Sequence, residues 1–246
     1  GTISDLPVLI EAAHAVDVPV ILDAAWGGHF GFHPQLPKHA FQVGADALIT
    51  STHKALPGYS ASALLLARTT LLSAERLEQS FETTHTTSPA GAPLASIDGV
   101  RALLETRGEE LIGALLTNIH RFKEMVQAEF ALPIFLYATD FPEGRFDPSK
   151  IVLRVQQLGA SGVEIEQDLQ AKGIRVEMAD RDTIVFLATI ADSQADFDSL
   201  ADALIPILKK RQEQRRESAT ALSWSVVPQR GISMRDAYFA KTEMID

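Results

Sequence analysis

The segment Leu48-Ile49-Thr50-Ser51-Thr52-His53-Lys54 places a lysine shortly after an apolar run. Upstream, Asp23 directly follows the apolar run Val18-Pro19-Val20-Ile21-Leu22. Short runs that are apolar on both sides are typical of strands buried in a parallel sheet. The sequence therefore predicts a carboxylate at the end of one strand and a lysine just past the end of the next.

This pair of residues suits the chemistry of pyridoxal phosphate. A lysine amine can close a Schiff base with the aldehyde of that cofactor. A carboxylate can keep the pyridinium nitrogen protonated, so that the ring accepts electrons. Two alternatives stay open: Asp23 as the cap of a turn or helix, and Lys54 as a solvated surface lysine. The spacing alone does not decide between them, so the interpretation depends on the neighbouring residues.

Two neighbouring segments resemble a known family. Residues 23–34, Asp-Ala-Ala-Trp-Gly-Gly-His-Phe-Gly-Phe-His-Pro, look like the signature Asp-Glu-Ala-His-Gly-Ala-His-Phe-Gly-Phe-His-Pro of the Orn/Lys/Arg decarboxylases. These are basic amino-acid decarboxylases built on the aminotransferase-like fold, fold type I of the enzymes that use pyridoxal phosphate. Gly-Ala-Asp at 44–46, followed by Ser-Thr-His-Lys at 51–54, matches the lysine motif of the same family. Later segments also resemble it, at 87–89 with 94–98, 173–180 and 234–240.

The resemblance implies further cofactor contacts beside Asp23 and Lys54. Ala25 matches the small residue that lets the pyridine ring lie flat, and Ser51 and His53 match contacts to the cofactor phosphate. Thr87 and Ser88 resemble a loop that reaches across a dimer to the partner's cofactor phosphate, although an ordinary polar turn is the alternative.

The activity implied by the resemblance is decarboxylation of lysine, arginine or ornithine to an amine and CO2, with pyridoxal 5'-phosphate held as a Schiff base on Lys54. A homodimer or higher homo-oligomer is expected. Ala24 and Trp26 stand where the family has Glu and His, which leaves the substrate side open, and neither Trp26 nor Glu177 is given a role. The alternatives are another fold type I reaction, such as transamination or aldol cleavage, and a non-catalytic homologue that serves as an oligomer subunit.

Composition narrows the class of protein. The chain has 246 residues, of which 46% are hydrophobic and 22% charged, as in a globular domain with a packed core. A net charge of −10 argues against nucleic acid as the main partner. The absence of cysteine excludes disulfides and thiolate sites and fits a cytoplasmic location, and no apolar stretch approaches the ~18 residues of a membrane span. Glycines and a proline around His29 and His33 argue against a shared helical face, so no metal is expected.

The order of the apolar patterns predicts an α/β fold: the C-terminal part of an aminotransferase-like large domain with a mostly parallel sheet, followed by a smaller α+β domain. We expect strands joined by right-handed parallel crossovers at 18–22, 47–50 and 61–67. Helices are expected at 36–43, 70–80, 94–106 and 108–130. In the smaller domain we expect strands at 151–155 and 183–189 and helices at 163–171 and 195–208.

The expected parts are a partial cofactor-binding large domain with a bridging helix at 1–131, a small α+β domain at 132–216, and a linker with the start of a truncated C-terminal domain at 217–246. Gly1 is not a methionine, and residues 234–246 are too few to complete a domain. The chain is therefore interpreted as an internal fragment that is inactive alone.

Overall fold

The computed structural model describes residues 1–68, 70–85, 88–213 and 229–243. These belong to two compact units, Gly1–Arg216 and Glu217–Asp246. The second unit contains the short helix α6 (Met234–Phe239). Within the described ranges, no helix has the length and apolar character needed to cross a membrane. The three-part division of the chain stays a prediction.

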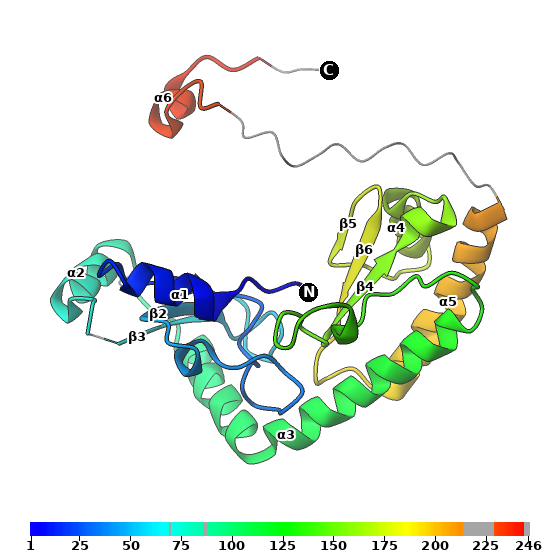
Figure 1. The fold of residues 1–246 in the computed structure, drawn as a ribbon, viewed down its shortest axis with the longest axis horizontal. Coiled ribbons are helices and arrows are strands. Elements are labelled where there is room, and N and C mark those ends of the chain that lie inside the picture. The colour runs from blue at the N-terminus through cyan, green and yellow to red at the C-terminus, as the bar shows by residue number, and fades with distance from the viewer. Residues whose placement is uncertain (69, 86–87, 214–228, 244–246) are drawn as a thin grey trace. The chain divides into compact units, whose positions relative to one another are not determined.

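The first sheet consists of β1 (Ile21–Asp23), β2 (Ala47–Ser51) and β3 (Ala63–Ala67), in that spatial order (Figure 1). β1 and β2 are parallel, with Asp23 opposite Ile49, which confirms a strand at 47–50 and a parallel neighbour before it. β2 is buried at four of its five positions, as its continuous apolar run predicts.

Two expectations for this sheet are wrong. β3 pairs with β2 antiparallel, because the connection 52–62 contains no helix and returns directly, whereas a parallel neighbour needs a longer crossover. The run expected as a buried strand at 18–22 is not buried, since Val18 and Ile21 are 49% and 53% exposed, and β1 begins only at Ile21. It is an edge strand among the described residues, with no strand on its outer side.

Two helices and one 3-10 turn belong to the same half of the unit as this sheet. In α1 (Leu6–His14), the buried Ile10 packs with Ala45 and Leu48. The helix expected at 36–43 is wrong, because only a 3-10 turn, η1 (Ala40–Gln42), forms there. Pro37 lacks an N–H donor and restricts the residue before it. α2 (Ala74–Thr84) begins later than expected, where the Ser73 hydroxyl accepts a hydrogen bond from the backbone of the first turn.

α3 (Gly91–Gln127) is a single helix of 37 residues, so the expected break between 106 and 108 is wrong. Gly108 is buried inside it, and a Cβ at that position would lie 3.5 Å from the Cβ of Phe32. The glycine therefore allows close packing rather than ending the helix. In Figure 1, α3 extends from the first sheet to the second.

The second sheet is antiparallel, with the order β4 (Lys150–Arg154), β6 (Thr183–Leu187) and β5 (Met178–Ala179). The helices α4 (Gly162–Gln170) and α5 (Gln194–Glu213) contribute to its core together with the second half of α3. The strands and helices expected here are confirmed, although α5 continues further. The short turns η2 (Ala138–Asp140) and η3 (Val155–Leu158) flank β4.

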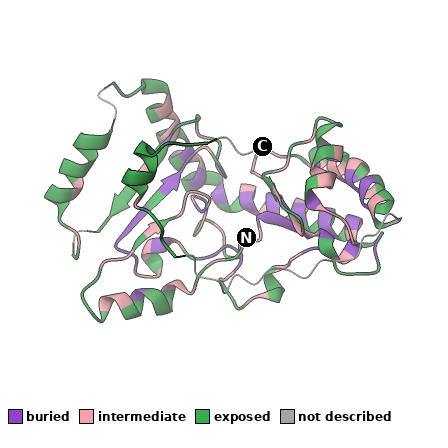
Figure 2. Cartoon of the chain, turned by 90° about the horizontal axis from the view of Figure 1, so that it is seen from above, coloured by how far each residue is buried: buried purple, intermediate pink, exposed green. Residues whose placement is uncertain are grey.

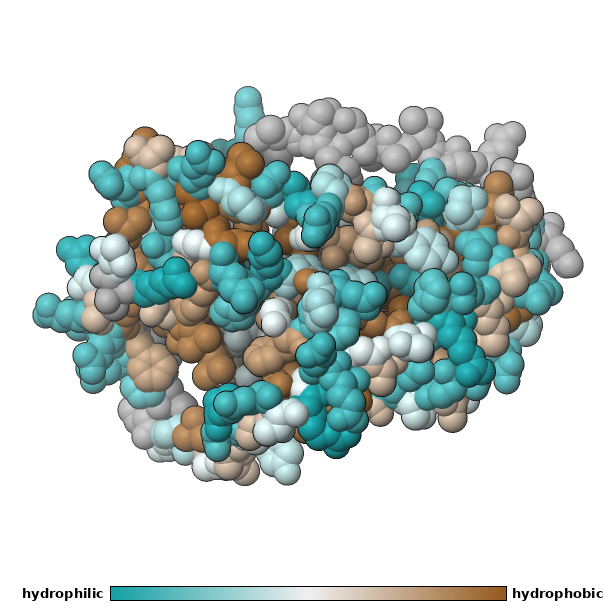
Figure 3. All heavy atoms as spheres, turned by 60° about the horizontal axis from the view of Figure 1, so that its bottom comes forward, coloured by the Kyte–Doolittle hydropathy of each residue, from teal (hydrophilic) through white to brown (hydrophobic). Residues whose placement is uncertain are grey.

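Burial differs between the two sheets. The largest cluster of buried hydrophobic residues surrounds the second sheet and includes Phe122, Leu153, Ile184 and Leu204. Around the first sheet, α2 has no buried residue and β3 is mostly exposed (Figure 2). Apolar side chains reach the surface on the half of the unit that contains the first sheet (Figure 3).

Candidate functional site

Asp23 and Ser51 are the last residues of β1 and β2, so they lie at the carboxyl ends of neighbouring parallel strands. In open α/β sheets this edge is the usual place for a ligand. Asp23 is exposed, and its Oδ1 accepts a hydrogen bond of 3.0 Å from the backbone N of Ala25. This contact is the one expected if Asp23 caps a turn. It uses only one of the two carboxylate oxygens. Among the described residues, no side chain forms an ion pair with Asp23.

Lys54 is exposed in the loop that follows β2. The loop is tightly wound, because the backbone N of Gly58 donates to the carbonyl of Thr52 at 2.7 Å. A Cβ at Gly58 would lie 2.4 Å from that carbonyl oxygen, so only glycine fits without a shift. The Thr52 and Ser62 hydroxyls, 2.5 Å apart, fasten the two ends of the loop. The lysine is therefore carried by a well-defined backbone while its side chain remains in solvent.

The loop after β1 packs directly on the end of β2. Thr50 donates from its hydroxyl to the carbonyl of Ala24 at 2.9 Å. A Cβ at Gly28 would lie 3.0 Å from the carbonyl oxygen of Ser51, so this glycine lets the two loops approach each other. Ser51 is buried and Ala25 half-buried in this arrangement. The structure thus gathers Asp23, Ala25 and Ser51 at one edge of the sheet.

His53 is half-buried, and its Nδ1 lies 2.8 Å from the carbonyl oxygen of Ser62. Because a carbonyl only accepts, Nδ1 carries the proton. The other nitrogen, Nε2, can donate to a phosphate only when the ring is protonated on both nitrogens. Ser88 is exposed ahead of α3, and Thr87 lies outside the described residues.

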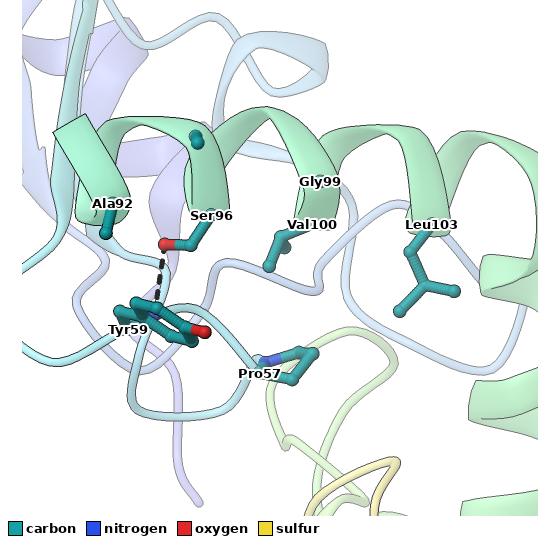
Figure 4. Close-up of a pocket in the computed structure, with 8 residues that line it drawn as sticks. Pro57, Tyr59, Ala92, Ser96, Gly99, Val100 and Leu103 are labelled. Carbon is teal, nitrogen blue, oxygen red and sulfur yellow. Dashed lines mark hydrogen bonds between the residues drawn. The ribbon is translucent and has the colours of Figure 1, made fainter.

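A cavity of about 410 Å³ lies between the lysine loop and the first turns of α3. Figure 4 shows Pro57 and Tyr59 facing the helix, and the backbone N of Tyr59 donates to the Ser96 hydroxyl at 3.0 Å. Small residues on the helix leave this space open; its helical lining is Ala92, Ala95, Ser96, Gly99, Val100 and Leu103.

A buried polar cluster was missed by the sequence analysis. His29 was considered there only as a metal ligand, whereas its Nε2 lies 2.9 Å from Ser149 Oγ and 3.4 Å from Asp147 Oδ1. Lys150 forms a salt bridge of 3.0 Å with the other oxygen of Asp147. Burial by itself raises the pKa of Asp147, but the hydrogen bond from His29 and the charge of Lys150 outweigh it and hold that pKa below its usual range.

No local pattern signals this cluster, because its two halves are more than a hundred residues apart in the chain. In the described ranges, no group of three or more His, Cys, Asp or Glu side chains is arranged to hold a metal ion.

Comparison with protein families identifies the family of this chain. The family model described as Orn/Lys/Arg decarboxylase, major domain, matches residues 1–196. The chain belongs to this family. Its similarity to an arginine decarboxylase of Bacillus subtilis (strain 168) is 33% identity over 252 residues, covering 100% of this chain and 51% of the relative. The chain thus spans about half the length of the curated relatives that it matches.

Two solved structures show that the family fold is present in this chain. Lysine decarboxylase A from Pseudomonas aeruginosa aligns with a TM-score of 0.71 at 17% identity, over 85% of this chain and 35% of that one. The ureidoglycine-glyoxylate aminotransferase of Bacillus subtilis aligns with a TM-score of 0.62 at 16% identity, over 88% of this chain and 59% of that one. The aminotransferase-like α/β fold expected from the sequence is confirmed.

Proposed function

We propose that the full-length protein removes the α-carboxylate of a basic amino acid as CO2 and leaves an amine, with pyridoxal 5'-phosphate as cofactor. The observation that carries the proposal is the position of Asp23 and Lys54, after neighbouring parallel strands, in a member of this decarboxylase family. Arginine is the first substrate to test, because relatives with 33% and 31% identity are arginine decarboxylases.

The residues present fit this cofactor. Neither Asp23 nor Lys54 forms a salt bridge within the described residues, so both are available to a ligand. The second carboxylate oxygen of Asp23 suits the N–H of a pyridinium ring, and the small side chain of Ala25 beside it leaves room for a flat ring. The close-packed backbone at Gly28 and Gly58 fixes the two loops that carry these groups.

Each side chain has a task in the proposed reaction. The bound cofactor supplies a ring that accepts the electron pair left on the substrate Cα when CO2 leaves. Lys54 holds the cofactor through Nζ until the substrate amine takes its place. Asp23 keeps the proton on the ring nitrogen, which stabilises the negative charge as it develops. Ser51 donates to the phosphate, and His53 donates from Nε2 when its ring is protonated on both nitrogens.

A phosphate dianion needs several donors, and Ser51 and His53 supply only two side chains. We propose that Thr87 and Ser88 of a second protomer complete the phosphate site in a homodimer or higher homo-oligomer. We also propose a cytoplasmic location, which the absence of cysteine supports.

The test is a product analysis of the full-length protein. Arginine, lysine and ornithine are each incubated with protein and cofactor, and the products are identified by mass, with Lys54→Ala as control. We expect the amine of one basic amino acid, and none from the control. A keto acid in place of the amine would identify transamination, and no product together with no covalent cofactor at Lys54 would favour a non-catalytic homologue.

A further inference from the structure

The buried polar cluster of His29, Asp147, Ser149 and Lys150 connects two distant parts of the chain. His29 belongs to the loop after β1, and the other three lead into or begin β4. The exposed fractions of the four residues are 3%, 3%, 1% and 1%, in chain order. Burying charged groups is costly unless they are paired and hydrogen-bonded. The contact between the loop and β4 is therefore specific.

The hydrogen bonds of this cluster assign the proton of His29. The Ser149 hydroxyl donates to Asp147 Oδ1 at 2.7 Å, and Lys150 Nζ donates to the same hydroxyl oxygen at 3.1 Å. The single hydroxyl proton is thus in use, so His29 Nε2 must donate to Ser149. The other nitrogen, Nδ1, is buried and has no hydrogen-bond partner among the described residues. His29 is held through Nε2 alone.

The same loop carries the proposed cofactor contacts. Asp23 and Ala25 precede His29 by a few residues. The start of this loop is attached to β2, because the backbone N of Ala24 donates to the carbonyl oxygen of Ile49 at 2.8 Å. Gly28 lies against the carbonyl of Ser51. His29 provides the second attachment, to Asp147 and Ser149. A segment fastened at both ends is ordered before a ligand arrives, which reduces the entropy cost of binding.

We propose that His29 is a positioning residue: its hydrogen bonds to Asp147 and Ser149 hold residues 24–29 in the arrangement that receives the cofactor ring at Asp23 and Ala25, and so link cofactor binding to the position of β4. The inference rests on the proposed function for the identity of the cofactor. The ordering of residues 24–29 is independent of it and can be measured without cofactor.

The experiment compares three variants of the full-length protein. His29→Leu removes the hydrogen bonds and replaces the imidazole with an apolar side chain of similar bulk. His29→Gln keeps an N–H near the position of Nε2. His33→Leu is the matched control, because His33 lies on the same loop and its imidazole accepts only from the backbone of Gln35 in the described hydrogen bonds. Pyridoxal phosphate affinity is measured by absorbance titration of the cofactor-free protein. Amide hydrogen exchange of residues 23–29 is measured without cofactor.

We expect His29→Leu to weaken cofactor binding about tenfold, the lower end of the range for losing a partner that orients a metal ligand. Exchange of residues 23–29 should accelerate relative to β2. His29→Gln should restore most of both properties, and His33→Leu should match the wild type. If His29→Leu does not fold, Ser149→Ala takes its place, with a smaller change in the same direction.

The outcomes separate this inference from the proposed function. Unchanged affinity and unchanged exchange in His29→Leu, beside a wild type that binds the cofactor, would overturn the positioning role and leave the proposed function intact. A variant that only unfolds more easily, with the same affinity and exchange pattern, would also overturn it. If the wild type binds no cofactor, the proposed function fails, and the exchange of residues 23–29 decides whether His29 orders the loop.

Discussion

The Asp23 and Lys54 side chains and the buried polar cluster use their hydrogen-bonding capacity in opposite ways. Asp23 is exposed with one carboxylate oxygen in a turn contact, and Lys54 is exposed. In the buried cluster, Asp147 receives a salt bridge from Lys150 and hydrogen bonds from the Ser149 hydroxyl and backbone. Spare capacity at the strand ends suits a ligand, whereas the saturated Asp147 carboxylate in the interior fixes the fold. This difference separates binding residues from positioning residues in the same loop.

The largest effect that tests this difference is expected for Asp23→Asn. Asparagine can still accept from the backbone of Ala25, so the turn is preserved, but it lacks the charge that holds a pyridinium proton. We expect the cofactor to bind while kcat falls by roughly three orders of magnitude, the scale of a loss of ~4 kcal/mol in electrostatic stabilisation. Steady-state kinetics of the full-length protein check this. A rate within a few-fold of the wild type would make Asp23 a turn residue only.

The second-largest effect is expected at the buried Asp147 carboxylate. Lys150→Met leaves the buried Asp147 carboxylate without its cation, and we expect a loss of about 3–5 kcal/mol in the free energy of unfolding. Urea denaturation near pH 7 measures it. The control is the double variant Lys150→Met with Asp147→Leu, which removes both charges and should recover part of the loss. Equal stability of Lys150→Met and the wild type would show that the salt bridge contributes nothing.

Lys123 differs from both the exposed strand-end groups and the paired Asp147. It is a buried lysine without a carboxylate partner in the described salt bridges. Its Nζ donates to the carbonyl of Leu136 at 2.9 Å and lies near the faces of Tyr137 and Phe146. Burial lowers its pKa to about 8, against the opposing attraction of Asp140 and Asp147. Since the unfolded lysine titrates near 10.4, the unfolded chain binds more protons between these two values, and this residue makes stability rise with pH there.

The prediction for Lys123→Met follows from this rise of stability with pH. Relative to this variant, the wild type should gain up to about 3 kcal/mol of stability as the pH rises from about 8 to about 10.5. Urea denaturation of both proteins across this range measures the difference, and other titrating groups cancel in the comparison. A constant difference across the range would mean that Lys123 has an ordinary pKa in the folded protein.

The sequence predicts the residues of the strand ends because local patterns specify them. A continuous apolar run marks β2, and both charged residues are close in sequence to their strands, because Asp23 ends β1 and Lys54 follows β2 by three residues. β4, β6 and the helices α4 and α5 were found for the same reason, whereas the two-residue strand β5 was not predicted. The resemblance of residues 23–34 and 51–54 supplied the family, which spacing alone does not.

Long-range pairing could not be predicted in the same way. Asp147 and Lys150 look like ordinary loop charges, and nothing near them identifies His29 as their partner. The direction of β3 depended on the conformation of residues 52–62, and local sequence did not reveal that Gly108 lies inside α3 beside Phe32. The buried cluster and the packing of Gly108 concern contacts between segments that are distant in sequence, where local patterns carry no information.

The smallest effect is expected for Gly58→Ala, which tests whether the exposed lysine needs the tight loop that carries it. The added Cβ would lie 2.4 Å from the carbonyl oxygen of Thr52, so the backbone must shift. We expect a loss of about 1–3 kcal/mol in the free energy of unfolding, the usual scale for forced overpacking. Because the shift displaces Lys54, the yield of covalent cofactor at this lysine should fall as well. Borohydride reduction and peptide mass mapping measure that yield.

Gly91→Ala is the matched control for this variant. A Cβ at Gly91 would have no heavy atom of the described residues within 4 Å, and the residue begins α3, where alanine is well tolerated. We expect stability and cofactor yield at or above those of the wild type. If Gly58→Ala behaves like this control, the loop tolerates displacement, and the position of Lys54 does not depend on the turn between Thr52 and Gly58. A loss of cofactor yield without a loss of stability would instead show that the turn serves the site more than the fold.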